Sequence, residues 1–169
     1  MISQLLTNLY ISSTLIYSPI TSPPVEEMIK SINPQGVRYA PIIYKVARKH
    51  NLPPEVLISI ISVESSFIHN KVSKTGDIGL AQVNPQVWSR EFKRRNIPFH
   101  PEKLKDPSYN IETMGKILSI IRKNSNDPIW YALYHSGTEI NKVFYAHKVY
   151  SRYLKIKEIK PPIYQLTAN

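Results

Sequence analysis

The sequence predicts a mostly α-helical fold in a single domain, and three observations support this prediction. The chain has 169 residues, the usual size of one globular domain with short extensions. It contains 14 prolines against five glycines, and several of the prolines directly follow residues that cap helices well. Between these prolines, apolar residues recur at spacings of three and four, which is the periodicity of a helix with one buried face.

The prolines also indicate where helices begin. A proline at the first helical position loses no hydrogen bond, because the first amide groups of a helix have no partner within it. Three cap–proline pairs have this pattern: Asn84-Pro85, Asp106-Pro107 and Asp127-Pro128. The expected helices span residues 36–50, 54–67, 85–95, 107–123, 128–135 and 139–155. The segment 70–82 has no helical period and contains two glycines, so we expect a short strand or hairpin there.

The chain is strongly basic, with 22 Lys plus Arg residues against 12 Asp plus Glu and a net charge of +10. We therefore expect it to be attracted to polyanions such as nucleic acid, acidic lipid or an acidic cell wall. It has no cysteine, which excludes disulfides, thiol catalysis and cysteine-ligated zinc. The five histidines include no His-x-x-x-His pair, so we expect no metal and no cofactor.

Charge also divides the chain into three parts. Residues 1–25 are uncharged and are interpreted as a signal-like leader or as an arm that docks on a partner. A transmembrane helix is disfavoured there, because Gln, Thr, Asn and Ser interrupt the apolar run. Residues 26–159 are expected to form the globular domain. Residues 160–169 are expected to form a C-terminal extension that begins as stiff, proline-containing chain.

Glu64 is the strongest candidate for a catalytic residue. In the helix expected to begin at Pro54, one apolar stripe consists of Leu57, Ile61 and Ile68. Glu64 falls on this stripe, three positions after Ile61. A carboxyl on the core-facing stripe loses solvent, which raises its pKa and lets it act as a general acid near neutral pH. Periodicity alone fits equally well with a capping or salt-bridged glutamate near a helix end.

Five linked motifs follow one another from Glu64 onward. They read Glu64-Ser-Ser-Phe67, Ser73-Lys-Thr-Gly76-Asp-Ile-Gly79-Leu80-Ala81-Gln82-Val83-Asn84-Pro85, Asp106-Pro107-Ser-Tyr-Asn110-Ile111, Tyr134-His135-Ser136-Gly137 and a late Tyr145. In this order the chain resembles the lytic transglycosylase domain of the soluble-lytic-murein-transglycosylase type, within glycoside hydrolase family 23 and related to goose-type lysozyme. The resemblance covers roughly residues 38–155.

The resemblance implies a lysozyme-like helical domain with a short loop or hairpin beside a cleft for a glycan strand. It also implies that Glu64 is the one catalytic acid and base of a peptidoglycan lytic transglycosylase. The carboxyl would protonate the oxygen between N-acetylmuramic acid and N-acetylglucosamine. It would then take the proton of the muramoyl 6-hydroxyl, so that a 1,6-anhydro ring forms without water. Most glycosidases use two carboxylates, and enzymes with a single one are exceptions.

The same resemblance implies four substrate-binding residues: Ser73, Gln82, Tyr134 and Tyr145. Ser73 and Gln82 would hydrogen-bond the sugars, although both residue types also cap loops. Tyr134 would stack on the catalytic carboxyl or hydrogen-bond near it. Tyr145 would donate to the substrate or to Glu64.

Several positions depart from the family's pattern. Asp77 stands where a small or apolar residue is usual, and we interpret it as an exposed loop residue. If Asp77 instead placed a water, the enzyme would be a lysozyme-type hydrolase. Ala81 replaces the usual methionine, and Asn141 stands where glutamate is common. His135 and Ser136 replace asparagine and alanine, which changes the expected sugar contacts; none of these changes removes the acid.

A function of another class also fits the basic composition. A basic cluster, interleaved with Trp88 and Phe92, consists of Arg90, Lys93, Arg94 and Arg95. It would grip DNA phosphates or the carboxylates of a cell wall, or would simply be a solvated helix face. On the DNA-binding interpretation, the chain is a structural component of a large assembly with a vestigial enzyme fold.

The setting of the favoured function follows from the same resemblance. Similar enzymes bore through the wall as parts of phage virions and of bacterial secretion machines. The sequence therefore favours a peptidoglycan-facing protein of a virion, with a periplasmic secretion accessory as the alternative. Glycan strands are the expected main partner, nucleic acid is secondary, and the leader would dock on the assembly.

Overall fold

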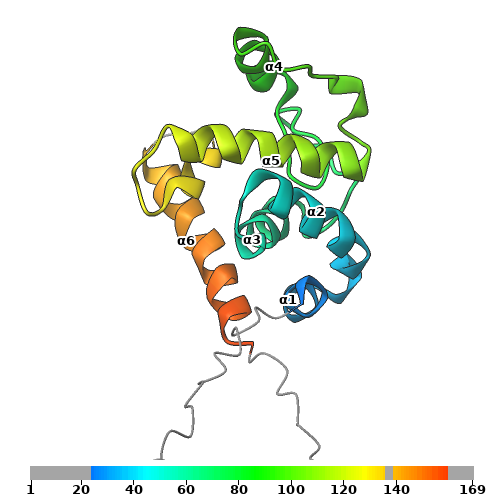
Figure 1. Cartoon of the computed structure of the whole chain (residues 1–169), viewed down its shortest axis with the longest axis vertical. Coiled ribbons are helices and arrows are strands. Elements are labelled where there is room, and N and C mark those ends of the chain that lie inside the picture. The colour runs from blue at the N-terminus through cyan, green and yellow to red at the C-terminus, as the bar shows by residue number, and fades with distance from the viewer. Residues whose placement is uncertain (1–23, 136–138, 160–169) are drawn as a thin grey trace, which may run out of the picture.

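The computed structural model describes residues 24–135 and 139–159, which are almost entirely helical (Figure 1). The α-helices are α1 (Val25–Ile32), α2 (Ala40–His50), α3 (Pro54–Ser65), α4 (Pro85–Arg94), α5 (Pro107–Lys123) and α6 (Glu139–Lys157). The 3-10 helices are η1 (Pro34–Tyr39), η2 (Pro101–Lys103) and η3 (Trp130–Tyr134). No β-strand occurs in the described residues. Between α3 and α4, isolated antiparallel bridges join Val72 to Ile78 and Ile78 to Val83. The predicted mostly α fold with a short hairpin-like loop is confirmed.

Helix α3 is the centre of the fold. Its residues from Glu55 to Ser62 are all buried, so the helix is enclosed on every side. An α-helix with apolar residues all round requires such an environment. The hydroxyl of Ser59 donates to the carbonyl of Glu55 at 2.7 Å, which removes the cost of burying it. Helices α1, α2 and α6 all pack against α3.

Helix α6 runs back along the domain from the end of α5 toward α1 (Figure 1). Near its end, Lys157 Nζ pairs with Glu55 Oε1 at 3.1 Å, at the start of α3. The Glu55 carboxyl is buried and requires such a partner. The pair joins the end of α6 to the start of α3, so the two helices run in opposite directions. As a result, the first turns of α6 lie beside the last turn of α3.

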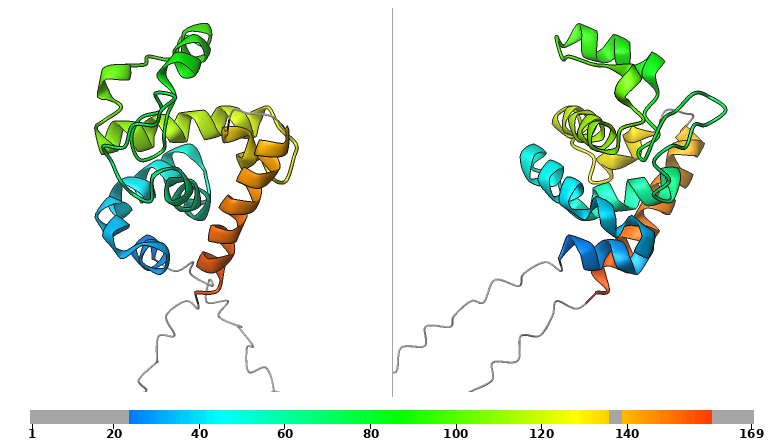
Figure 2. Two further views of the ribbon diagram at one scale, coloured as in Figure 1. Left: turned by 180° about the vertical axis from the view of Figure 1, so that it is seen from behind. Right: turned by 90° about the vertical axis from the view of Figure 1, so that its right-hand side faces the viewer.

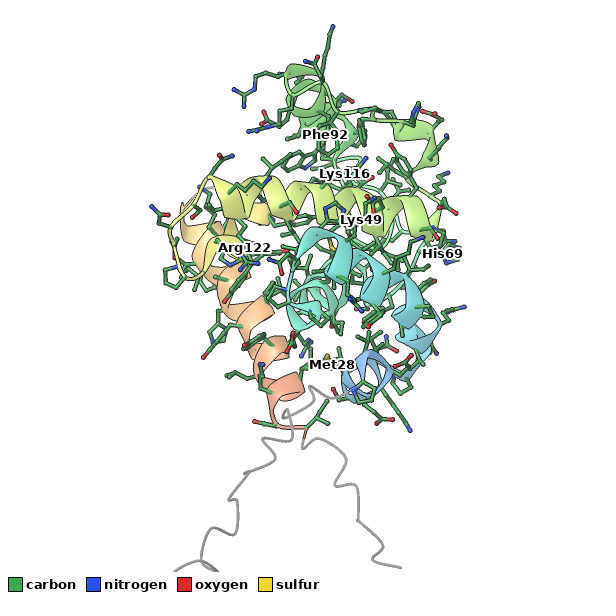
Figure 3. The ribbon with its side chains drawn as sticks, in the orientation of Figure 1. Met28, Lys49, His69, Phe92, Lys116 and Arg122 are labelled. Carbon is green, nitrogen blue, oxygen red and sulfur yellow. The ribbon has the colours of Figure 1, made fainter. Side chains whose placement is uncertain are left out.

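Helix α4 stands apart from the other helices, beyond α5, in every view (Figures 1 and 2). An aromatic cluster anchors it. The ring of Phe92 is buried, and it contacts Trp88 and Phe99 with ring centroids 5.7 and 5.1 Å apart. Phe92 lies on the side of α4 that faces α5 (Figure 3). Asn84 begins the helix as predicted, because its side chain accepts from the amides of Gln86 and Val87.

The segment between α3 and α4, residues 66–84, is called the cleft loop below. The Asn110 side chain of α5 makes two hydrogen bonds to this loop and a third to the segment before α5. Its Oδ1 accepts from the amide of Ala81 at 2.8 Å, and its Nδ2 donates to the carbonyls of Ile78 and Leu104 at 2.9 and 2.8 Å. Gly79 has a φ of +82°, and a Cβ there would lie 2.3 Å from Asn110 Nδ2. Only glycine therefore fits at this position.

The structure corrects several expected elements. Helix α3 ends at Ser65 rather than at 67, so Ile68 lies outside the helix and is 53% exposed. The prediction that Ile68 belongs to the core stripe is therefore wrong. The expected helix 128–135 is the shorter 3-10 helix η3, and the expected helix 36–50 is divided into η1 and α2. Helix α1 was not expected.

The predicted leader 1–25 and extension 160–169 lie almost wholly outside the described residues, so their proposed roles stay predictions. Helix α1 and the end of α6 both lie at the end of the domain opposite α4 (Figure 1). Among the described helices, none combines the length and the apolar character that crossing a membrane requires.

Replacing Asn110 by alanine should lower the free energy of unfolding by about 3 kcal/mol, because the partners of two buried hydrogen bonds and one partly buried one lose their contacts. Urea unfolding followed by circular dichroism measures the change. Asn124→Ala is the matched control, since this residue is exposed just beyond α5 and should change stability by less than about 0.5 kcal/mol. Equal stability of both variants would contradict the role given to Asn110.

Candidate active site

Glu64 lies in the last turn of α3, and unusual backbone follows it directly. Ser66 and Phe67 both have positive φ values, 51° and 65°. This conformation is unfavourable for residues other than glycine. Tertiary packing stabilises this backbone, because the Phe67 ring is buried against Gly36. The contact is so close that a Cβ at position 36 would lie 2.6 Å from Phe67 Cδ1. Asn33 Nδ2 also donates to the carbonyl of Ser66 at 3.0 Å.

The Glu64 side chain is half-buried, and burial raises the pKa of its carboxyl to about 7. Interaction with the Tyr145 hydroxyl opposes this rise, as does the positive charge of Lys71, while the negative charge of Asp77 adds to it. Loss of solvent dominates because a carboxylate loses more hydration free energy on burial than these neighbours restore. A carboxyl with this pKa is partly protonated at neutral pH. The expected desolvation of Glu64 is thus found. Ile68, which the sequence placed on the same apolar stripe, is exposed and does not contribute to it.

Two buried tyrosines from different helices interact with the Glu64 carboxyl. Tyr145 of α6 is buried, and its hydroxyl has no hydrogen-bond partner of ordinary length within the described residues. It lies close enough to Glu64 to lower the pKa of that carboxyl. Tyr134 of η3 is also buried, and its hydroxyl donates to the carbonyl of Ala81 at 2.8 Å. Tyr134 therefore stabilises the cleft loop. The negative charge of Glu64 helps to raise the pKa of Tyr134, although the two side chains are not hydrogen-bonded.

Asp77 is part of the internal structure of the cleft loop. Its Oδ2 accepts from the hydroxyls of Ser73 and Thr75 at 2.7 and 2.6 Å, and its Oδ1 accepts from Asn84 Nδ2 at 2.7 Å. Burial raises the pKa of Asp77, but the three donors outweigh it, so the pKa lies below its ordinary value. Asp77 is therefore an ionised carboxylate that organises the loop, and it is only partly exposed, unlike the interpretation from sequence.

The hydroxyl of Ser73 and the amide of Gln82 are also engaged within the cleft loop. Ser73 Oγ accepts from the amides of Thr75 and Asp77 at 3.2 and 3.0 Å. Gln82 Nε2 donates to the carbonyls of Lys71 and Gly79 at 3.1 and 2.9 Å. Both residues thus have the loop-capping contacts considered above, and their role in sugar binding stays a prediction.

A pocket of about 270 Å³ opens beside Glu64. Its lining residues come from the end of α3, from the segment after η3 and from the first turns of α6: Val63, Glu64, His135, Asn141, Phe144, Tyr145 and Lys148. The last turn of α3, the cleft loop and the start of α6 turn toward the same face (Figure 2, right). Glu64 is the only carboxyl among the residues that line this pocket.

His135 stands in the pocket where the resemblance leads one to expect asparagine. Its ring stacks on that of Tyr145, with centroids 5.0 Å apart and planes inclined by 14°. This contact packs the Tyr145 ring of α6 against the segment that follows η3. Ser136 lies outside the described residues.

Sequence reasoning missed three residues at this site. Lys71 Nζ donates to the carbonyl of Glu64 and so holds the end of α3 to the cleft loop. No motif position marks it. Phe144 and Lys148 line the pocket from α6. Lys148 could have been found by helical period, because it lies three residues after Tyr145 and shares its face.

The structure also bears on the other candidates. No cluster of three or more potential metal ligands occurs in the part of the chain that the structure describes. In the predicted basic cluster, Arg94 and Arg95 both pair with Glu91, at 2.8 and 2.6 Å. The carboxylate of Glu91 therefore neutralises part of the positive charge with which this cluster would bind DNA phosphates.

Comparison with known proteins identifies the class to which this fold and pocket belong. Residues 41–150 match the model of the Transglycosylase SLT domain family. Because the match covers well over half of the chain, this protein belongs to that family.

Two curated relatives illustrate the similarity. Membrane-bound lytic murein transglycosylase C of Actinobacillus pleuropneumoniae is 30% identical over 155 residues, which cover 84% of this chain and 42% of that protein. Endo-type membrane-bound lytic murein transglycosylase A of Klebsiella pneumoniae is 32% identical over 91 residues, covering 52% of this chain and 44% of that protein. The chain thus spans less than half the length of these relatives.

A solved structure supports the fold. It is that of an inactive mutant of the lytic transglycosylase Slt from Pseudomonas aeruginosa, with a TM-score of 0.57 and 19% identity. The match covers 68% of this chain and 23% of that one. The predicted lysozyme-like architecture is therefore confirmed at the level of fold.

Replacing Glu64 by glutamine should stabilise the protein at pH 8 and have little effect at pH 4. The pKa of this carboxyl is about 7 in the folded state, above its unfolded value, so ionisation disfavours folding as pH rises through this interval. The expected gain at pH 8 is about 3 kcal/mol, measured by urea unfolding. Glu27→Gln, which changes an exposed carboxyl of α1, should shift stability by less than about 0.5 kcal/mol at either pH. A pH-independent effect of Glu64→Gln would argue against the burial described here.

Proposed function

We propose that this protein is a peptidoglycan lytic transglycosylase that uses Glu64 as its only acid and base. One observation carries the proposal: Glu64 is the single carboxyl in the lining of its pocket, and its pKa is about 7. A carboxylic acid that stays partly protonated at neutral pH suits general acid catalysis. Membership of the family and the names of the relatives, which are lytic murein transglycosylases, support the same activity.

The first chemical step requires a protonated Glu64. The carboxyl donates its proton to the glycosidic oxygen between N-acetylmuramic acid and N-acetylglucosamine as the bond to the muramoyl C1 breaks. The resulting carboxylate then accepts the proton of the muramoyl 6-hydroxyl, whose oxygen attacks C1. A 1,6-anhydromuramoyl end forms, and Glu64 returns to its protonated state. A pKa near the working pH serves both halves of this cycle, because the same group must give and take a proton.

The state of Asp77 favours this outcome over hydrolysis. An enzyme that admits water commonly uses a second carboxylate to activate it. Asp77 is the nearest candidate, but it accepts three hydrogen bonds within the cleft loop and does not line the pocket. Its charge still raises the pKa of Glu64 from a distance. A lysozyme-type muramidase remains the alternative outcome of the assay below.

Four residues are proposed to support the reaction around Glu64. Tyr145, with its buried hydroxyl free of ordinary hydrogen bonds in the described residues, is oriented to donate to the carboxylate or to the substrate. Tyr134 holds the cleft loop through Ala81. Gln82 is proposed to bind the sugars through its side-chain carbonyl oxygen, because its Nε2 already donates to two loop carbonyls. Ser73 is proposed to bind them by exchanging a loop contact for a sugar hydroxyl, because its Oγ already donates to Asp77 and accepts from two amides.

We further propose that the protein faces peptidoglycan as a local wall-boring component of a phage virion or of a secretion machine. The net charge of +10 supports approach to an acidic wall. Mass spectrometry of the native protein distinguishes the two settings: an intact Met1 or Ile2 start favours an uncleaved virion arm, and loss of the leader favours secretion to the periplasm.

Wild-type protein should release muropeptides with anhydromuramoyl ends from purified murein, and Glu64→Gln should lower the rate by at least about 10²-fold. Mass spectrometry of the products measures both the rate and the type of end. Glu27→Gln is the control and should retain full activity. Because Glu64→Gln is expected to be at least as stable as wild type, its loss of activity cannot come from unfolding.

Other products of this assay have definite meanings. Reducing muramoyl ends would make the enzyme a lysozyme-type hydrolase and would contradict the lone-acid mechanism. No release by wild type, or undiminished release by Glu64→Gln, would reject both enzymatic interpretations. Salt-sensitive DNA binding without murein cleavage would then favour the structural, DNA-contacting function.

The alkaline limb of the pH–rate profile should follow the protonation of Glu64, so activity should fall as pH rises above about 7. Lys71→Met removes a positive charge that lowers the pKa of Glu64, and it should move this limb to higher pH. Asp77→Asn removes a negative charge that raises the same pKa, and it should move the limb to lower pH. Lys155→Met, which changes an exposed cation near the end of α6, should leave the limb unchanged. Shifts of the same sign in both test variants would contradict this electrostatic account.

A further inference from the structure

Phe144 and Lys148 form the outer edge of the catalytic pocket. They lie four residues apart on α6, and residues at this spacing are neighbours on one face of a helix. Both line the pocket that contains Glu64, and both are exposed. Neither belongs to the motifs that carry the family resemblance. The edge of the pocket therefore combines one aromatic ring and one cation.

The Phe144 side chain packs little against the described part of the domain, so most of its apolar surface is in contact with solvent. Its side chain is 66% exposed, although a phenyl ring gains about 2 kcal/mol when it is fully buried. Its neighbour Val143 is equally exposed, at 66%, but does not line the pocket. Phe144 thus presents an apolar ring directly beside the space where substrate would lie. The apolar face of a sugar ring can cover such a surface.

Lys148 is also without a partner in the part of the chain that the structure describes. Two other lysines of the described domain differ in this respect, since Lys49 pairs with Glu112 and Lys157 pairs with Glu55. No ion pair or hydrogen bond of Lys148 occurs among the described residues, and its pocket holds no carboxyl other than Glu64. A solvated cation at the edge of a pocket attracts an anionic group of a ligand.

We propose that Phe144 and Lys148 form a subsite for a sugar ring that bears a carboxylated substituent. The ring lies against Phe144, and the carboxylate of its substituent pairs with Lys148. This inference rests on the proposed function, because it takes the ligand to be a peptidoglycan strand. It goes further by naming the part of the ligand that is selected: sugars whose peptide stems carry free carboxylates, in preference to uncharged glycan.

Binding experiments with the Glu64→Gln variant separate the two contributions, since this variant should hold glycan without cleaving it. One ligand is a set of purified murein fragments with intact peptide stems. The matched ligand is the same set after amidation of its carboxylates, which removes charge and leaves the sugars unchanged. Isothermal titration calorimetry at low salt should give tighter binding of the charged fragments by up to about fivefold. Raising the salt concentration should reduce this preference.

Second substitutions in the Glu64→Gln background assign the preference to residues. Lys148→Met should abolish the preference for charged fragments and leave the affinity for amidated fragments unchanged. Phe144→Ala should weaken binding of both ligands by about five- to tenfold. Lys155→Met and Val143→Ala are the matched controls on the same helix, and each should leave both affinities unchanged. All four positions are exposed, so thermal unfolding should show little change in stability.

Each outcome decides between the inference and the function on which it rests. If both fragment sets bind equally well, with or without Lys148→Met, the glycan site stands and the charged subsite is rejected. If Phe144→Ala and Val143→Ala have the same effect, the aromatic part of the subsite is rejected. If the Glu64→Gln variant binds neither fragment set, the subsite is rejected together with the proposed function.

Discussion

The three hydrogen bonds of the Asn110 side chain are the contact on which the site depends. They join α5 to the cleft loop and to the segment before α5, and the bonds to Ala81 and Leu104 are buried. The amide of Ala81 donates to Asn110, and the carbonyl of the same residue accepts from Tyr134. One peptide segment is thus held from two helices at once. Because buried polar groups are costly when unpaired, this arrangement leaves the loop little freedom to move.

With the loop fixed, the electrostatics of the pocket follow from a balance of opposing effects on Glu64. Burial and the charge of Asp77 raise the pKa of the carboxyl, whereas Tyr145 and Lys71 lower it. The balance gives a value of about 7. Of the three neighbouring residues that contribute, the cleft loop supplies Asp77 and Lys71, and α6 supplies Tyr145. The same loop that Asn110 anchors therefore tunes the acid as well as enclosing it.

The structure shows which contacts are made by the residues that depart from the family's pattern. Ala81 contributes through its backbone, so replacing methionine by alanine leaves both of its hydrogen bonds in place. Asp77 organises the cleft loop through three donors. His135 supports Tyr145 by ring stacking. The edge of the pocket, by contrast, is formed by Phe144 and Lys148, which extend the site beyond the residues that the motifs identify.

The sequence by itself determined the helical class and most helix starts, and it singled out Glu64 as the candidate acid. These features depend on local chemistry: a cap residue followed by proline, an apolar period and a motif with fixed spacing. It could not determine that α3 stops at Ser65, because the stop depends on the Phe67 ring packing against the distant Gly36. The same reason explains why Ile68 was misplaced.

Only the tertiary structure decided which side chains face the pocket and which are engaged elsewhere. Ser73 and Gln82 have motif positions, yet their side chains hydrogen-bond within the loop. Lys148 has no motif position, yet it lines the pocket. The pKa of Glu64 likewise depends on neighbours from the cleft loop and α6. The pKa of a buried group depends on all the groups that are close to it in space. The number of residues between two groups along the chain does not reveal how close they lie.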